Sequence, residues 1–99
     1  MTLPVTFLRA AHAEFIEAAA WYEAQRPGLG TEFIVQIEQC TVLAAEQPQR
    51  YAVVHNGTRR ITAERFPYSV YFQVQARRVV VLAVFHSSRD PSIWQRRAG

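Results

Sequence analysis

The sequence has 99 residues, of which 49% are hydrophobic and 19% are charged, a composition typical of one globular domain spanning residues 1–99 and not of a disordered chain. No apolar run approaches the roughly 20 residues that span a bilayer, and the first residues, Met1 to Arg9, lack the apolar stretch of a signal peptide. The single cysteine, Cys40, excludes an internal disulfide. Together these features predict a cytoplasmic protein.

Charge is distributed unevenly between the two halves of the chain. Residues 1–48 carry two Arg and six Glu, a net charge of −4, whereas residues 49–99 carry nine Arg against Glu64 and Asp90, a net charge of +7. The chain has no lysine. The imbalance favours an acidic partner, either nucleic acid or protein; the alternative explanation is a GC-rich genome that prefers arginine codons.

The first half predicts a short strand followed by a helical hairpin. Met1 to Leu8 alternates loosely and is read as a strand. Ala10 to Gln25 has apolar residues at helical spacing, and Pro27-Gly28-Leu29-Gly30 ends that helix. Thr31 is the expected N-cap of a second helix, which Pro48 stops. The expected buried stripe of the second helix is Phe33 or Ile34, Ile37, Cys40 or Thr41, and Ala44.

The second half predicts antiparallel strands. Tyr51 to Val54 and Arg59 to Arg65 flank His55-Asn56-Gly57, a strong hairpin signal because Asn and Gly tolerate positive φ. Tyr68 to Val74 and Arg78 to Phe85 form a second expected hairpin, and the unbroken apolar run 79–85 predicts a central strand covered on both faces. Residues 92–97 predict a short helical tail. The fold class is therefore α+β, with an N-terminal strand and an α-helical hairpin packed on an antiparallel β-sheet.

Metal, cofactor and acyl-transfer chemistry find no support in the sequence. The three histidines are scattered, and Cys40 lies on an apolar helical stripe, so no metal site is expected. Gly28 and Gly30 lie between helices and do not follow a strand, which argues against a phosphate loop and leaves no expected cofactor. Glu14 and Glu17 share a helix face, and we interpret both as solvated surface residues.

One polar cluster is expected at the end of the last strand. Arg, His and an aromatic side chain on a sheet edge can hold RNA by phosphate pairing and base stacking, and Trp and Arg also favour protein interfaces. The structural alternative is that His86 and Arg89 tie the tail to the sheet while Trp94 packs on the core. The candidate partner-binding residues are Arg59, Arg60, Arg65, His86, Arg89, Trp94, Arg96 and Arg97.

An ordered set of motifs runs through nearly the whole chain. In order, the motifs are Ala20-Trp21-Tyr22-Glu23, Pro27-Gly28-Leu29-Gly30, Phe33 and Ile37, Pro48, Arg59-Arg60, Arg65-Phe66-Pro67-Tyr68-Ser69-Val70-Tyr71, and His86-Ser87-Ser88-Arg89-Asp90-Pro91 with Trp94 and Arg97. By this set the sequence resembles the RelE/ParE superfamily of bacterial type II toxins, within it the ParE-like, plasmid-stabilisation branch. The resemblance implies a helical hairpin on an antiparallel sheet and a cognate antitoxin with an acidic C-terminal segment, DNA being contacted only through that antitoxin.

The superfamily divides in function. RelE-like members cut messenger RNA on the ribosome, which requires a base, an acid and cations around the scissile phosphate. This chain lacks lysine, carries Ser69 where RelE-like chains carry Arg, and has Trp94 as its C-terminal aromatic. ParE-like members are regarded as non-enzymatic inhibitors of DNA gyrase, and that is the expected function. The alternatives are a ribosome-dependent nuclease using His86, Arg89 and Arg65, or a degenerate member that only binds antitoxin.

Overall fold

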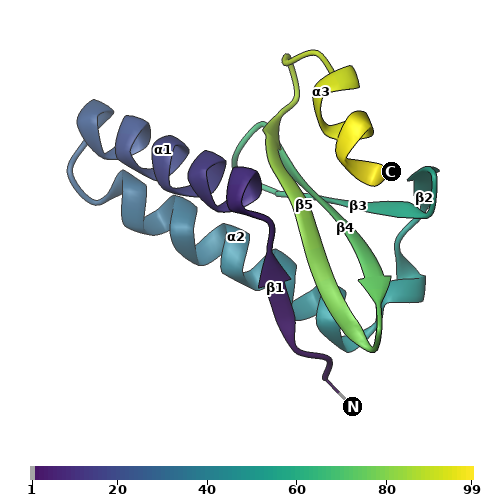
Figure 1. The fold of residues 1–99 in the computed structure, drawn as a ribbon. Coiled ribbons are helices and arrows are strands. Elements are labelled where there is room, and N and C mark those ends of the chain that lie inside the picture. The colour runs from purple at the N-terminus through teal and green to yellow at the C-terminus, as the bar shows by residue number, and fades with distance from the viewer. Residues whose placement is uncertain (1) are drawn as a thin grey trace.

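The structure is a computed structural model that describes residues 2–99 (Figure 1). Its strands and helices follow the expected order. They are β1 (Val5–Phe7), α1 (Arg9–Gln25), α2 (Leu29–Glu46), the 3-10 turn η1 (Pro48–Arg50), β2 (Val53–His55), β3 (Thr58–Thr62), β4 (Tyr68–Gln75), β5 (Arg78–His86), α3 (Ser92–Gln95) and the 3-10 turn η2 (Arg96–Ala98). The α+β fold is confirmed. β1 is shorter than the expected strand 1–8, whose first residue lies outside the described residues.

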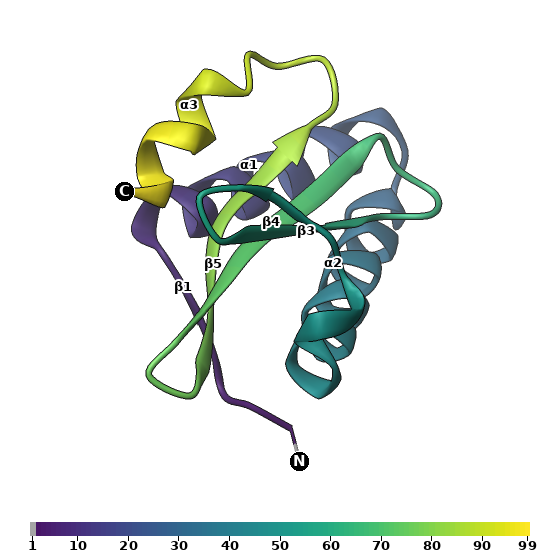
Figure 2. The ribbon, with the colours of Figure 1, turned by 90° about the vertical axis from the view of Figure 1, so that its right-hand side faces the viewer.

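The strands form one sheet in the order β1-β5-β4-β3-β2. β1 pairs with β5 in parallel, and the other neighbouring strands are antiparallel. Every residue from Val79 to Phe85 is buried, so the unbroken apolar run is the central, doubly covered strand that the sequence predicts. Figures 1 and 2 show α1 and α2 together on one side of the sheet and α3 on the other.

The turn of the helical hairpin differs from the prediction. Thr31 does not cap the second helix, so that prediction is wrong. α2 begins at Leu29, and its N-cap is Gly28 in the left-handed conformation (φ 91°). The cap is supplied from α1, because the Glu23 carboxylate accepts hydrogen bonds from the backbone N–H groups of Gly28 (3.0 and 3.1 Å) and Gly30 (3.0 Å). A negative charge at a helix N-terminus is favourable. Gly30 is required, since a Cβ there would lie 2.6 Å from the carbonyl oxygen of Ala19.

The main core lies between the hairpin and the sheet. The expected stripe of α2 is confirmed, with Phe33, Ile37, Cys40 and Ala44 buried. Phe33 is the centre of an aromatic cluster that includes Phe15, Tyr22, Phe66 and Tyr68, with ring centroids 5.0–6.2 Å from its own. Cross-helix and helix–sheet contacts of this kind add to burial energy, so this cluster fixes how the hairpin sits on the sheet.

Both β-hairpins turn through residues with positive φ. Asn56 (φ 43°) and Gly57 (φ 71°) link β2 to β3, as the Asn-Gly signal predicts, although β2 begins later than expected and includes His55. Ala76 (φ 50°) and Arg77 (φ 62°) link β4 to β5. The second turn places two ordinary residues in the left-handed region, where each costs roughly 1 kcal/mol.

A second, smaller core covers the other face of the sheet. Trp94 is 3% exposed and stacks on Tyr71, with ring centroids 4.1 Å apart and planes 18° apart. Ala83, Phe85 and Ile93 complete this cluster. The tail is therefore an integral layer of the fold. Within residues 2–99, none of the helices is long and apolar enough to cross a membrane.

Candidate functional site

Of the residues predicted to cluster at the end of β5, Arg89 and Arg97 are brought together, and the residue that joins them is Glu14 on α1. The Glu14 carboxylate accepts two hydrogen bonds from the Arg97 guanidinium (2.9 and 3.0 Å) and one from Arg89 (3.0 Å). The Glu14 side chain is 10% exposed and that of Arg97 is 18% exposed. The interpretation of Glu14 as a solvated surface residue is wrong; Glu17, one turn on, is exposed as expected.

This cluster occupies the edge of β5 beyond the end of β1. β1 stops at Phe7, opposite Val81, so the following residues of β5 have no strand partner on that side. The carboxylate of Glu14 accepts a hydrogen bond from the backbone N–H of Val84 (3.2 Å), and the Arg97 guanidinium donates one to the carbonyl oxygen of Leu82 (3.0 Å). Buried backbone N–H and C=O groups need hydrogen-bond partners. Here the Glu14–Arg97 ion pair provides the acceptor and the donor that a neighbouring strand would otherwise provide.

A β-bulge explains why Leu82 is available. In the β4–β5 pairing, Tyr71 lies opposite Ala83 but Phe72 lies opposite Val81, which leaves Leu82 as an extra residue without a cross-strand partner. A bulge re-aims the backbone locally. Consecutive carbonyls of β5 then bond on the same side, that of Val81 to the N–H of Leu8 (2.9 Å) and that of Leu82 to Arg97.

Arg89 is held from two directions. Besides its bond to Glu14, its guanidinium lies 4.1 Å above the ring of Phe85. Cation–π contact and ion pairing both reduce the freedom of the side chain. Arg89 and Arg97 therefore tie the segment after β5 and the C-terminal tail to α1, as the tail-anchoring alternative requires for Arg89.

His86, the last residue of β5, has a fixed ring. Its Nδ1 accepts a hydrogen bond from the backbone N–H of Ser88 (3.0 Å) and lies 2.8 Å from the Ser88 hydroxyl. A backbone N–H can only donate, so the neutral ring carries its proton on Nε2. The ring meets Tyr68 edge to face at 5.2 Å. Burial, reinforced by neighbouring Tyr22 and Glu14 and opposed by Arg89, raises the pKa of Tyr68, which keeps the phenol protonated at neutral pH.

The remaining candidate arginines lie apart from His86 or are already bonded. Arg65, in the loop after β3, pairs with Glu32 on α2 (2.8 Å), and Arg59 donates to the carbonyl of Tyr51 (2.7 Å). Arg60 and Arg96 are exposed and make no side-chain hydrogen bond or ion pair with another residue of the described range 2–99. Arg60 lies opposite Tyr71 and so shares the sheet face that carries the tail.

Sequence reasoning missed Glu14, although a signal was present. Glu14 lies three residues after Ala11 and four before Ala18, both buried, so it falls on the apolar face of α1 by helical spacing. A charged residue on such a face needs a partner. What the sequence does not contain is the identity of the partner, Arg97, which lies 83 residues further along.

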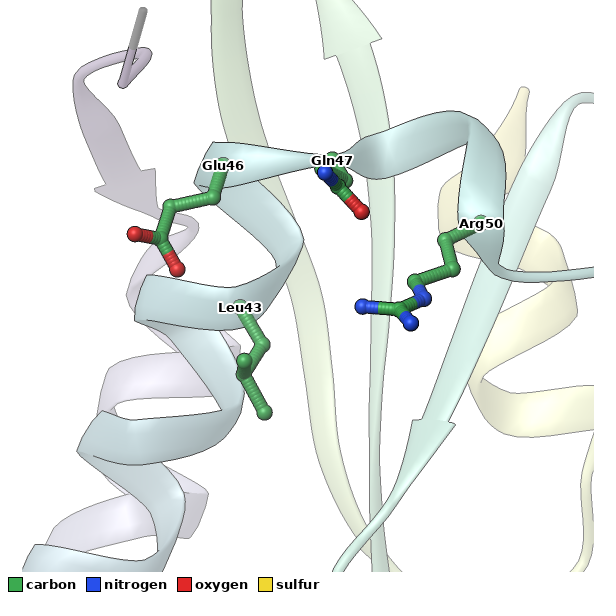
Figure 3. Close-up of a pocket in the computed structure, with 4 residues that line it drawn as sticks. All are labelled: Leu43, Glu46, Gln47 and Arg50. Carbon is green, nitrogen blue, oxygen red and sulfur yellow. The ribbon is translucent and has the colours of Figure 1, made fainter.

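The surface also has hollows away from this cluster. One of about 330 Å³ lies at the end of α2 and is lined by Leu43, Glu46, Gln47 and Arg50. Figure 3 shows the Arg50 side chain reaching from η1 back toward α2. None of the predicted site residues lines it. Across residues 2–99, no group of three His, Cys, Asp or Glu side chains is placed to hold a metal ion.

Comparison with known proteins decides the family. Residues 5–91 match the family model described as the ParE toxin of the type II toxin–antitoxin system, parDE. The chain belongs to the ParE toxin family. It is thus a toxin of a type II toxin–antitoxin system, and its partner is an antitoxin. The RelE/ParE resemblance drawn from the motifs is confirmed in its ParE-like form.

A solved structure supports the fold of this ParE-family chain. A chain described as belonging to a chromosomal ParDE TA system from P. aeruginosa superposes with a TM-score of 0.75 at 19% identity, covering 86% of this chain and 96% of that one. At this identity the likeness speaks for the fold alone. No curated protein matches the sequence.

Proposed function

We propose that this ParE-family toxin acts by binding DNA gyrase without catalysing a reaction of its own, and that an acidic segment of its antitoxin neutralises it. The observation that carries the non-enzymatic part is the state of the candidate cations. Arg89 and Arg97 are bonded to Glu14, and Arg65 is bonded to Glu32. A nuclease needs cations aimed at a phosphate, whereas these side chains stabilise the fold.

The name of the target rests on the family resemblance. ParE-like toxins are regarded as gyrase inhibitors, and the departures from the RelE-like set agree with that branch: no lysine, Ser69 after Tyr68, and Trp94 in place of a phenol. Trp94 is in addition buried in the second core, where its indole packs on Tyr71 and supports the tail.

The antitoxin contact follows from the charge that remains free. Arg60 and Arg96 are exposed on the tail side of the molecule, and within residues 2–99 neither forms an ion pair. Free guanidinium groups suit carboxylates. Arg60→Glu with Arg96→Glu is expected to weaken antitoxin binding about tenfold or more. Arg77→Glu with Arg78→Glu, in the turn before β5 and at its first residue, serves as the matched control. Equal loss in both variants would show a non-specific charge effect.

The first test is pulse-labelling of DNA and protein synthesis in bacteria, minutes after the toxin is induced without its antitoxin. The proposal expects DNA synthesis to fall first while translation continues. A collapse of translation first would replace the gyrase proposal with the nuclease alternative.

One observation favours that alternative. His86, whose Nδ1 is bonded to Ser88, packs edge to face on the protonated phenol of Tyr68. The pair offers a proton donor for the leaving oxygen, and the base that takes the ribose hydroxyl proton would have to come from the ribosome-bound substrate complex. If this pair cleaves RNA, His86→Ala abolishes toxicity although the protein remains folded, and toxin-dependent cuts appear in messenger RNA. Unchanged toxicity of His86→Ala would eliminate the nuclease role of the ring.

A further inference from the structure

α2 carries a second apolar stripe on the face that points away from the core. Val35, Val42 and Leu43 are 47%, 52% and 44% exposed. Val35 and Val42 are seven residues apart, which is two helical turns, so they lie on one side of the helix. The core stripe of α2 already contains Phe33 and Ile37. The helix is therefore apolar on two sides, and only one side faces the sheet.

The outer stripe borders a set of neighbouring hollows. A hollow of about 390 Å³ is lined by Val35, Glu38, Gln39, Val42 and Leu43. A second, of about 260 Å³, lies on the β3 side and shares Gln39 and Leu43 with the first. The hollow at the end of α2 also includes Leu43 (Figure 3). Leu43 lines all three hollows, and we call the surface that they make up along α2 the α2 groove.

The rim of this groove is acidic. Glu38, Glu46 and Glu64 line its three parts, and none of them makes a side-chain ion pair or hydrogen bond with another residue in 2–99. α2 itself contains no basic residue, and Arg50 is the cation that lines the groove at its end. Glu14 and Glu32, by contrast, are each paired with two arginines. Three carboxylates without an ion-pair partner in residues 2–99 thus line the hollows along α2.

We propose that the groove along α2 is a docking site for a basic amphipathic helix of a partner protein. Apolar anchors at helical spacing fill a hydrophobic groove in helix-in-groove recognition, and Lys or Arg side chains flanking the anchors complement the three carboxylates. The site is separate from the proposed antitoxin contact, because α2 covers one face of the sheet while Arg60 and the tail lie on the other.

Two other occupants are disfavoured by the same charges. A second copy docking α2 against α2 by two-fold symmetry would bring Glu38 and Glu46 of both copies into one interface, where like charges repel. An acidic antitoxin segment meets the same repulsion. The charge pattern thus selects a basic helix from a third protein.

The test uses two synthetic helical peptides of 21 residues, with Leu at heptad positions a and d and either Arg or Glu at e and g, titrated into the ¹⁵N-labelled protein. We expect the Arg peptide to bind at least roughly tenfold more tightly than the Glu peptide, as several surface ion pairs together allow, and to shift the amides of residues 35–46. The preference should shrink in 1 M salt. Equal affinity of both peptides, or shifts confined to the sheet or tail, would overturn the proposal.

Variants separate charge from apolar contact. Glu38→Arg with Glu46→Arg should reverse the peptide preference, and Val42→Asp should abolish binding of the Arg peptide. Ile16→Asp is the matched control, since Ile16 is 50% exposed on α1, and it should leave binding unchanged. All four positions are exposed, so the amide spectra should show a folded protein. A preference that survives the double charge reversal would contradict the proposal.

Discussion

Neutralising Glu14 is expected to destabilise the whole fold. The carboxylate accepts four hydrogen bonds, three from guanidinium groups and one from the backbone N–H of Val84. Glu14→Gln removes the charge and turns an amide N–H₂ group toward the guanidinium of Arg97. Arg97 keeps its bond to the carbonyl of Leu82 but loses a carboxylate acceptor in a site that is largely buried. Breaking a fully buried ion pair costs about 3–5 kcal/mol.

The expected magnitude is lower than that range. Arg89 is 43% exposed, so water screens its share of the interaction, and the Gln oxygen can still accept one bond. We expect Glu14→Gln to lower the free energy of unfolding by about 2–3 kcal/mol, which for a domain of this size is a fall in Tm of roughly 10–20 °C. Arg97→Gln combined with Glu14→Gln should show a coupling energy of at least about 1 kcal/mol.

Urea denaturation followed by circular dichroism measures this effect. The control is Glu17→Gln, which removes the same charge from an exposed position one turn further along α1 and should change stability by less than about 0.5 kcal/mol. If Glu14→Gln and Glu17→Gln were equally stable, the ion-pair cluster would contribute nothing, and the account of how the edge of β5 is covered would be refuted.

Three further predictions concern single features of the fold. Ala76→Asn with Arg77→Gly should stabilise the protein by about 1 kcal/mol in urea denaturation, because Asn and Gly adopt the left-handed turn at lower cost; unchanged stability would contradict this. Burial, aided by nearby Glu64, raises the pKa of Cys40 to about 11, so iodoacetamide should modify the thiol only in denaturant, and rapid labelling of the native protein would be the contrary result. A hydrogen bond from Arg65 is the main cause that lowers the pKa of Glu32 below its ordinary 4.5, so the stabilisation from this carboxylate is present above pH 4.5 and is lost as pH falls through the lowered pKa. NMR titration of Glu32 should give a midpoint below 4.5 in the native protein, and Arg65→Gln should move that midpoint upward.

The elements of the fold were predictable because their signals are local. Helical spacing places Phe33 and Ile37 on one face, and Asn56-Gly57 supplies the positive φ of a tight hairpin. The unbroken run 79–85 has the composition of a doubly covered strand. Each of these inferences uses residues within one or two turns or one strand.

The wrong predictions for Thr31 and Glu14 have one physical origin. In both cases the deciding hydrogen bond is made by a residue that lies in another element of the fold. Thr is a residue type that commonly caps helices, but Glu23 of α1 supplies the cap of α2 because Gly30 lets the two helices pack closely. Glu14 has the sequence context of a surface residue because its partner, Arg97, lies in the tail. The bulge at Leu82 carries no mark in the sequence, since an apolar run has the same pattern with or without it.

The sequence predicts which residues belong to the candidate site, but it does not predict which of their side chains are paired within the protein. The sequence places His86, Arg89, Trp94 and Arg97 at or just after the end of the last strand. In the structure Arg89 and Arg97 meet at Glu14, His86 ends β5, and Trp94 is buried in the second core. Which of them are free for a partner depends on side-chain pairing. Arg89 and Arg97 are bound to Glu14, so a cluster rich in cations by sequence offers less free charge than its composition indicates.

Non-catalytic inhibition of gyrase is tested by a supercoiling assay with purified gyrase and this toxin, beside a His86→Ala variant shown to be folded. We expect supercoiling to fall with increasing toxin, the variant to inhibit equally well, and antitoxin to restore the activity. Supercoiling that is untouched at micromolar excess of toxin would contradict the claim.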